Sequence, residues 1–251
     1  MHVIGRLYSD EFDFPLRTEA PDISYTIATL PRSGSTHLSI ELWRSGVLGS
    51  PLEYINVGNI GAITGRLGGG DILRYWSEVQ ARRTGPNGVF GYKSFAMNFL
   101  NISRRFPQLL PHLAPAHVIY LVRGDKLAQA VSYARAMQTR IWFAGVEPER
   151  APEYSFEAIS RCLGMIDNQE ATWERIFNLT NACPLRLEYG EVRKDPAGTI
   201  ERVAAHIGVA VSADARLDIP GTDVQSDAIN REWLARYRKE AHAQSAAAAS
   251  I

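Results

Sequence analysis

The sequence is poor in cysteine and carries no excess of charge of either sign. Its 251 residues include only two cysteines, Cys162 and Cys183. Two cysteines cannot form a disulfide framework or supply four ligands to a structural zinc ion, and we expect both to be buried free thiols. Lysine plus arginine and aspartate plus glutamate number 27 each, so net charge gives no reason to expect a nucleic-acid partner. Any anion site must come from a local arrangement of arginine, hydroxyl and backbone N–H groups.

Long apolar runs are also missing. No stretch approaches the roughly 18 apolar residues of a membrane span. Residues 1–22 are acidic and lack the apolar core of a signal peptide. From these two absences we expect a cytoplasmic protein without a membrane span.

Short buried strands alternate with amphipathic helices along the chain. Segments rich in β-branched or aromatic residues predict strands at 24–30, 89–95, 117–123 and 184–190. Helical patterns cover 35–46, 71–83, 125–138, 155–181, 195–208 and 226–243. This alternation is typical of an α/β fold with a central, mainly parallel sheet and helices on both faces. We predict a single domain over residues 1–240, and an Ala-rich tail at 241–251 that frays.

The loop after the first strand is similar to a phosphate-binding loop but lacks its lysine. Residues 29–37 read TLPRSGSTH. A strand, a glycine-containing turn and a helix together direct backbone N–H groups at an anion. Overlaid on the pattern G-x-x-x-x-G-K-[ST], Gly34 and Thr36 match, whereas Ser35 stands where the lysine would be. Arg32 supplies a positive charge from within the loop, so the loop favours an anion but gives little support to Mg²⁺-dependent nucleotide hydrolysis.

A second cation follows the third strand. Arg123 comes directly after the apolar run VIYLV, which places it at the carboxyl edge of the sheet, where open α/β sheets bind ligands. Ser132 lies in the next helix, with Gln129 three residues earlier on the same face. Two anion-binding sets on adjacent strand ends suit a ligand with two separated phosphates.

Together these elements resemble the sulfotransferases that use 3′-phosphoadenosine-5′-phosphosulfate (PAPS). The stretches that carry the resemblance are LPRSGST, GSPLEY, YLVRGDKLAQAVSYARAMQTRIW and SDAINREW. They are most similar to the bacterial branch of trehalose 2-sulfotransferase type, which includes glycolipid and lipopolysaccharide sulfotransferases. The similarity spans residues 24–240.

The resemblance implies a role for each phosphate element. The P-loop-like turn would hold the 5′-phosphosulfate with Arg32, Ser33, Gly34, Ser35 and Thr36, and Arg32 would also act in catalysis. Arg123 and Ser132 would bind the 3′-phosphate, for which an arginine fork and a hydroxyl are well suited. A donor-rich loop with one arginine can position the donor and stabilise charge on its leaving oxygen without a metal.

The resemblance also implies a general base. In the trehalose-type branch the glutamate of an EY motif serves as the general base, and in this sequence that glutamate is Glu53. A carboxylate held within about 3 Å of a sugar hydroxyl can take its proton. His37 is the rival base, and Lys93 either lines the acceptor pocket or pairs with a surface acid. Gln138, Arg140 and Trp142 resemble family positions near the acceptor.

The implied reaction is in-line transfer of a sulfuryl group from PAPS to a hydroxyl of a carbohydrate or glycolipid, leaving adenosine 3′,5′-bisphosphate. The alternatives are a nucleotide kinase or hydrolase with a degenerate loop, and a non-catalytic binding protein with a sulfotransferase-like fold.

The stretch 223–230 departs from the family, because it lacks the arginine that often contacts the nucleotide there. Homodimers are common in the family, although no segment of this sequence specifies an interface.

Overall fold

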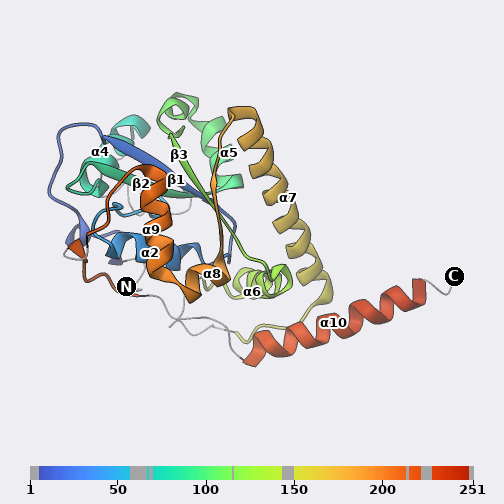
Figure 1. Ribbon diagram of the computed structural model, residues 1–251. Coiled ribbons are helices and arrows are strands. Elements are labelled where there is room, and N and C mark those ends of the chain that lie inside the picture. Colours follow the sequence, from blue (N-terminus) through green and yellow to red (C-terminus); the bar gives the residue numbers. More distant parts are fainter. Residues whose placement is uncertain are drawn as a thin grey trace.

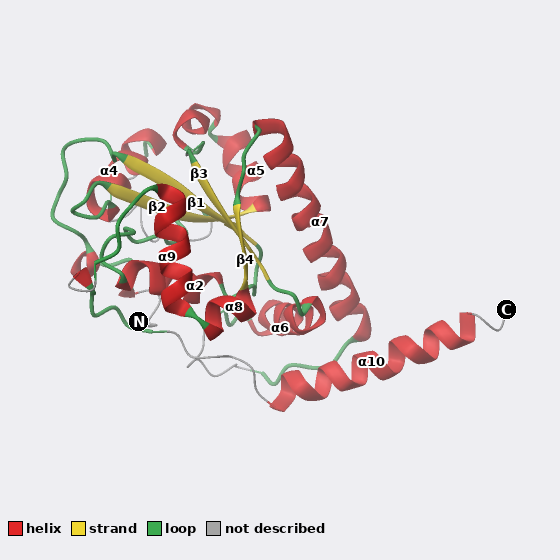
Figure 2. Cartoon of the chain, in the orientation of Figure 1, coloured by secondary structure: helices red, strands yellow, loops and turns green. Residues whose placement is uncertain are grey.

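A four-stranded parallel sheet forms the centre of the computed structural model (Figures 1 and 2). The structure describes residues 6–56, 67, 70–114, 116–142, 150–212, 215–221 and 228–248. The strands are β1 (Ile23–Thr29), β2 (Val89–Phe95), β3 (His117–Val122) and β4 (Leu185–Glu188), in the order β2-β1-β3-β4. Every neighbouring pair is parallel. The α/β fold with a parallel sheet is therefore confirmed, and all four predicted strands are present.

The helices in the described part of the chain cover the sheet and its edges. The α-helices are α2 (Ser35–Arg44), α4 (Ile72–Arg83), α5 (Ala96–Arg105), α6 (Lys126–Thr139), α7 (Phe156–Thr180), α8 (Tyr189–Lys194), α9 (Pro196–Ile207) and α10 (Ala228–Ala248). Of two short 3₁₀ helices, η1 (Asp10–Phe12) precedes β1 and η2 (Pro107–His112) lies between α5 and β3. The sequence predicts six of the α-helices and misses α5 and α8.

Alternating residues of the central strands enter separate cores, which places helices on both faces. Tyr25 and Ile27 of β1 pack with α2 and α9, whereas Ala28 of the same strand packs with α6 and α7. A further core joins α4 to β2 and to the segment before β1. Figure 1 shows α2 and α9 on one side of the sheet and α7 on the other. Strands buried on both faces explain the nearly continuous apolar runs in the sequence.

Local capping chemistry sets several helix ends. Asp195 accepts a hydrogen bond from Gly198 N at the start of α9, and Gly208 ends that helix at φ +77°. Glu188 caps α8 by accepting from Gly190 N at 2.6 Å. Because this cap begins a helix at Tyr189, β4 ends two residues before its predicted end at Gly190.

The structure also places the two cysteines and the C-terminal end of the described chain. Cys162 is buried as predicted, but Cys183 is exposed, because it lies in the turn between α7 and β4. Helix α10 continues to Ala248, through most of the segment 241–251, in keeping with the high helix propensity of alanine. Figure 1 shows that α10 projects away from the body of the molecule.

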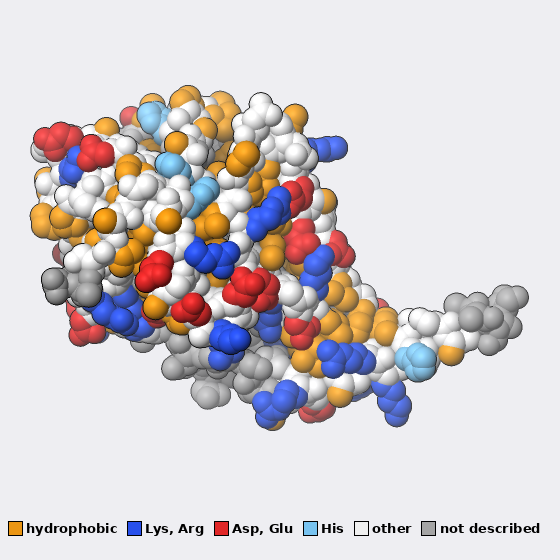
Figure 3. Space-filling model, viewed as in Figure 1, with side chains coloured by type: hydrophobic (Ala, Val, Ile, Leu, Met, Phe, Trp, Pro, Cys, Tyr) orange, Lys and Arg blue, Asp and Glu red, His pale blue; other side chains and the backbone are white. Residues whose placement is uncertain are grey.

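Acidic and basic side chains are interspersed on the face of the molecule drawn in Figure 3. Among the surface ion pairs, Arg186 pairs with Glu174, and Lys126 pairs with both Asp167 and Glu170. This mixture agrees with the balanced composition of the chain. Within the described residues, no helix has the length and apolar character needed to cross a membrane.

Candidate functional site

The parallel sheet brings the predicted site residues to one edge. Because β1, β2 and β3 run in the same direction, their carboxyl ends lie together. The loop 30–34 follows β1, Lys93 lies near the end of β2, and Arg123 directly follows β3. The sequence predicts this convergence, and the side-chain contacts below define it.

The loop after β1 has a fixed and unusual backbone. Arg32 and Gly34 both have positive φ, +63° and +83°. A Cβ at Gly34 would lie 2.0 Å from the Tyr189 ring, so both the backbone conformation and this packing require glycine. The Ser33 hydroxyl is buried and lies 2.7 Å from that of Thr29, the residue that replaces the first glycine of the nucleotide-binding pattern. The contact between these two hydroxyls thus links the end of β1 to the turn.

Two buried side chains hold the same loop from outside. Gln129 of α6 donates from Nε2 to the carbonyl of Pro31 at 2.8 Å. Trp173 of α7 donates from Nε1 to the carbonyl of Thr29 at 2.9 Å. These contacts fix a loop that leads into the N-terminus of α2 at Ser35, where the first N–H groups have no partner within the helix. The sequence places Gln129 on the face of Ser132 but gives no sign of this contact.

The two predicted phosphate elements meet through Arg32. Its Nε donates to Ser132 Oγ at 2.9 Å, and its Nη1 donates to the carbonyl of Trp142 at 2.6 Å. Arg123 in turn donates from Nη1 to the carbonyl of Arg32 at 3.3 Å. The loop arginine therefore lies between the candidate 5′- and 3′-phosphate positions.

Positive charge is concentrated at this point. Burial, together with the positive charges of Arg123 and Arg135, lowers the pKa of Arg32 to about 10. Burial also lowers the pKa of Arg123. Arg32 keeps its charge at neutral pH. A polyanion bound at this edge would therefore meet a cluster of positive charges.

Glu53 reaches the same edge because its segment runs beside β2. The backbone N–H of Lys93 donates to the carbonyl of Leu52 at 2.9 Å. The Lys93 ammonium then lies 3.0 Å from Glu53 Oε1 and donates to Thr36 Oγ1, also at 3.0 Å. Asn56 donates to the other carboxylate oxygen of Glu53 at 2.8 Å. Lys93 therefore pairs with the candidate base, and joins it to the first turn of α2.

His37 belongs to the first turn of α2. The charged groups that act on its pKa are Glu41, Arg193 and Arg44, and burial is the main cause that lowers it. In the described part of the chain, none of the recorded hydrogen bonds or ion pairs joins His37 to Glu53 or Lys93. Glu53, by contrast, forms the ion pair with Lys93 that joins it to the first turn of α2.

The residues expected near the acceptor lie at the end of α6. Trp142 is 41% exposed, and its ring lies 6.1 Å from that of Tyr133. The side-chain amide of Gln138 donates to the Glu153 carbonyl and accepts from the Glu153 N–H. Arg140 ends the helix at φ +56°. Most of the departure from the family at 223–230 falls on 223–227, outside the described residues.

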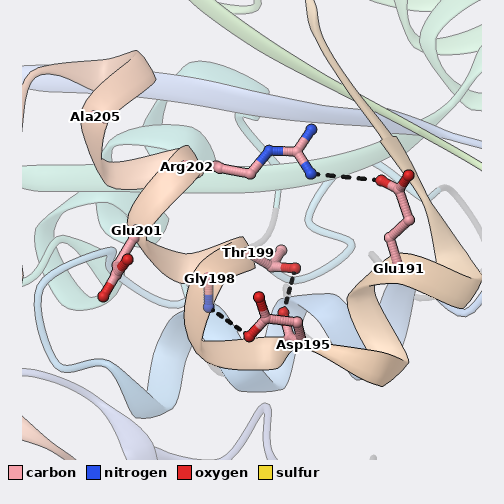
Figure 4. A pocket seen from close by; sticks show the side chains of 7 residues that line it. All are labelled: Glu191, Asp195, Gly198, Thr199, Glu201, Arg202 and Ala205. Carbon is pink, nitrogen blue, oxygen red and sulfur yellow. Dashed lines mark hydrogen bonds and ion pairs between the residues drawn. The ribbon is translucent and has the colours of Figure 1, made fainter.

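A separate cavity of about 460 Å³ lies between α8 and α9 (Figure 4). Among its lining residues, Arg202 pairs with Glu191, and the Asp195 carboxylate accepts from the backbone N–H of Gly198. None of the predicted site residues lines this cavity. Across the described residues, no group of three or more His, Cys, Asp or Glu side chains is arranged to hold a metal ion.

Comparison with known proteins agrees with the resemblance seen in the sequence. A family model described as Stf0 sulphotransferase matches residues 24–240. The chain is 32% identical over 127 residues to a trehalose 2-sulfotransferase of Mycolicibacterium smegmatis, covering 49% of this chain and 46% of that protein. It is 26% identical over 183 residues to a trehalose 2-sulfotransferase of Mycobacterium tuberculosis, covering 66% of this chain and 67% of that protein. The first of these matches thus spans about half the length of the relative.

Solved structures of sulfotransferases are more distant. A sulfotransferase from Alicyclobacillus acidocaldarius has a TM-score of 0.49 at 14% identity, covering 88% of this chain and 92% of that one. A mouse sulfotransferase, SULT7A1 complexed with PAP, has a TM-score of 0.45 at 18% identity, covering 85% of this chain and 65% of that one.

Proposed function

The chain belongs to the Stf0 sulphotransferase family, and we propose that it transfers a sulfuryl group from PAPS to a hydroxyl of a carbohydrate or glycolipid. The observation that carries this proposal is the position of Lys93. Its ammonium contacts both Glu53 and Thr36, so the candidate base lies one side chain away from the candidate donor loop. A transferase needs its two substrates to meet in this way.

The donor would occupy the positively charged edge of the sheet. The loop N–H groups, the hydroxyls of Ser35 and Thr36, and the guanidinium of Arg32 would hold the 5′-phosphosulfate. Arg123 and Ser132 would hold the 3′-phosphate. The Arg32–Ser132 contact supports this assignment, because it brings both elements within reach of one nucleotide bisphosphate.

The acceptor hydroxyl would lose its proton to the carboxylate of Glu53. The hydroxyl oxygen forms a bond to sulfur as the bond between sulfur and the 5′-phosphate oxygen breaks, and the leaving group is adenosine 3′,5′-bisphosphate. When Glu53 takes the proton, its ion pair with Lys93 loses its negative partner. The Lys93 ammonium can then act on the negative charge that shifts toward the donor loop.

A carbohydrate acceptor is supported by the curated relatives, which are named for the sulfation of trehalose. The exposed ring of Trp142 adds a surface on which an apolar sugar face can pack, and Arg32 holds the backbone of that residue. Trehalose and trehalose-containing glycolipids are therefore the first acceptors to test.

The proposal is tested by incubating the protein with PAPS labelled in its sulfuryl group and with a panel of free sugars and glycolipids. We expect label on a carbohydrate hydroxyl and release of adenosine 3′,5′-bisphosphate. A protein that binds this nucleotide but labels no acceptor would support the non-catalytic alternative. A preference for ATP with Mg²⁺ would support the kinase or hydrolase.

A further inference from the structure

The backbone that carries Glu53 is held at three consecutive residues. The Leu52 carbonyl accepts from Lys93 N at 2.9 Å. The Glu53 N–H donates to the hydroxyl oxygen of Tyr8 at 3.1 Å. The Tyr54 carbonyl accepts from the hydroxyl of Tyr75 at 2.8 Å. The segment has no regular secondary structure of its own at Glu53, so these three contacts hold the backbone from which the carboxylate extends.

From this arrangement we propose that Tyr8 is a positioning residue for Glu53: its hydroxyl holds the backbone N–H of the base and so fixes the direction of the carboxylate toward the acceptor. This inference rests on the proposed function and deepens it. Of the three anchors, Tyr8 alone bonds the backbone of Glu53 itself. It acts through Glu53 and is assigned no contact with either substrate.

Tyr8 is held in this position by Arg83, a buried arginine at the end of α4. Arg83 is 1% exposed and pairs with Asp13 at 3.0 Å. It also donates to the carbonyls of Leu7 and Ser9, the two neighbours of Tyr8, at 3.0 Å each. A guanidinium that bonds the residues on either side of Tyr8 fixes the backbone there. The tyrosine is thus a rigid support for the segment beside it.

The phenol is in the right form for this role. Burial, followed by the charge of Glu53, raises the pKa of Tyr8 well above its ordinary value. The hydroxyl therefore stays neutral across the range in which a carboxylate base works, and its oxygen accepts from Glu53 N throughout. The Tyr8 ring also lies edge-on to that of Tyr54, with centroids 6.2 Å apart.

The test compares Tyr8→Phe with Tyr92→Phe, each alone and each combined with Glu53→Gln. Tyr92 is a suitable control because its buried hydroxyl also binds a backbone group, the Leu113 carbonyl at 2.8 Å, away from Glu53. We expect Tyr8→Phe to lower kcat about 10-fold, since small displacements of a catalytic group are costly. The KM for PAPS and the affinity for adenosine 3′,5′-bisphosphate should be unchanged. Tyr92→Phe should lower the Tm by about as much as Tyr8→Phe does, because each removes one hydrogen bond between a hydroxyl and the backbone. It should leave kcat unaltered.

The combined variants separate positioning from general stability. In the Glu53→Gln background, Tyr8→Phe should cause no further loss of the residual rate. A wild-type kcat in Tyr8→Phe, or an equal loss with and without Glu53, would overturn the assignment. Should Tyr8→Phe fail to fold, hydrogen exchange in the unmodified protein decides: the Glu53 amide should be protected, and rapid exchange would overturn the contact.

Failure of the proposed function gives a different result. If the unmodified protein moves no sulfuryl group from PAPS to any acceptor, the transferase proposal fails. The exchange rate of the Glu53 amide then still reports whether Tyr8 holds it. Slow exchange with no transfer would keep the anchor and remove its catalytic meaning.

Discussion

The ammonium of Lys93 and the carboxylate of Glu53 form an ion pair of 3.0 Å in which the side chains are 3% and 12% exposed. The two residues come from different kinds of structure, a central-sheet strand and an irregular segment along its edge. Their contact places a carboxylate next to a loop built for anions.

Replacing Lys93 by methionine should damage both stability and transfer. The change leaves a nearly buried Glu53 without its cation, and breaking a buried pair from one side costs about 3–5 kcal/mol. Urea unfolding should show this loss in Lys93→Met. The double variant Lys93→Met with Glu53→Gln should recover part of it, because the uncompensated charge is then gone. Equal unfolding free energies for Lys93→Met and the unmodified protein would show that the pair is absent in solution.

Replacing Glu53 by glutamine should remove transfer but keep nucleotide binding. The amide has nearly the shape of the carboxylate but cannot accept the proton, and loss of a general base lowers rates by about 10²–10⁴-fold. The measurement is the rate of labelled transfer beside the Kd for adenosine 3′,5′-bisphosphate. Glu78→Gln is a matched control, because Glu78 makes only a partly exposed pair with Arg82 on α4. Full activity in Glu53→Gln would rule this residue out as the base.

Replacing Arg123 by alanine should weaken binding of nucleotides that carry a 3′-phosphate. Charge-assisted hydrogen bonds are worth about 1.5–3 kcal/mol, so the Kd for adenosine 3′,5′-bisphosphate should rise at least 10-fold. The Kd for adenosine 5′-phosphate should change little. Arg186→Ala, which removes an exposed pair with Glu174, serves as the control. An equal effect on both nucleotides would place Arg123 elsewhere in the donor site.

Replacing Arg32 by asparagine should raise the stability of the free protein while weakening donor binding. Burial and two nearby arginines lower the pKa of Arg32 to about 10, so the folded state disfavours a charge that is present at pH 7 in both states. This cost is constant below pH 10 and decreases only as the pH rises through the folded pKa. Asparagine removes the charge and tolerates the positive φ.

For Arg32→Asn we expect a Tm higher by about 2–4 °C and a Kd for the bisphosphate raised about 10-fold or more. Thermal scans without and with the bisphosphate measure both. A lower Tm would show that the contacts with Ser132 and Trp142 outweigh the repulsion.

Replacing His37 by asparagine should leave transfer within about threefold of the unmodified rate, because nothing in this account places His37 at the reacting atoms. The variant should instead change the pH dependence of stability. Burial lowers the pKa of His37, so the unfolded chain binds the proton more readily, and stability falls as the pH drops below the ordinary value of about 6.5. His37→Asn removes this contribution, and its unfolding free energy should fall less between pH 7 and pH 5. A transfer rate reduced 100-fold would make His37 the base.

The strands and the anion-binding edge could be predicted because they depend on local patterns. Buried parallel strands read as short apolar runs, and the residues that directly follow them must meet at one edge. Helix α5 was missed because Phe95 offers no side-chain cap at its start. Helix α8 was missed because it is short and contains Gly190.

The contacts within the site depend on distant parts of the chain. Lys93 meets Glu53 because the segment that carries Glu53 runs along the edge of β2. Tyr8 reaches Glu53 from another segment, which Arg83 of α4 holds in place. No spacing in the sequence encodes either approach. The homodimer, the cytoplasmic location and the identity of the acceptor stay predictions.

The binding of adenosine 3′,5′-bisphosphate, compared with adenosine 5′-phosphate and with ATP plus Mg²⁺, tests the central claim most directly. The account predicts that the bisphosphate binds at least 10-fold more tightly than either competitor. It also predicts that the preference over adenosine 5′-phosphate is lost in Arg123→Ala. Equal affinity for all three ligands, or tighter binding of ATP with Mg²⁺, would contradict a PAPS-dependent sulfotransferase.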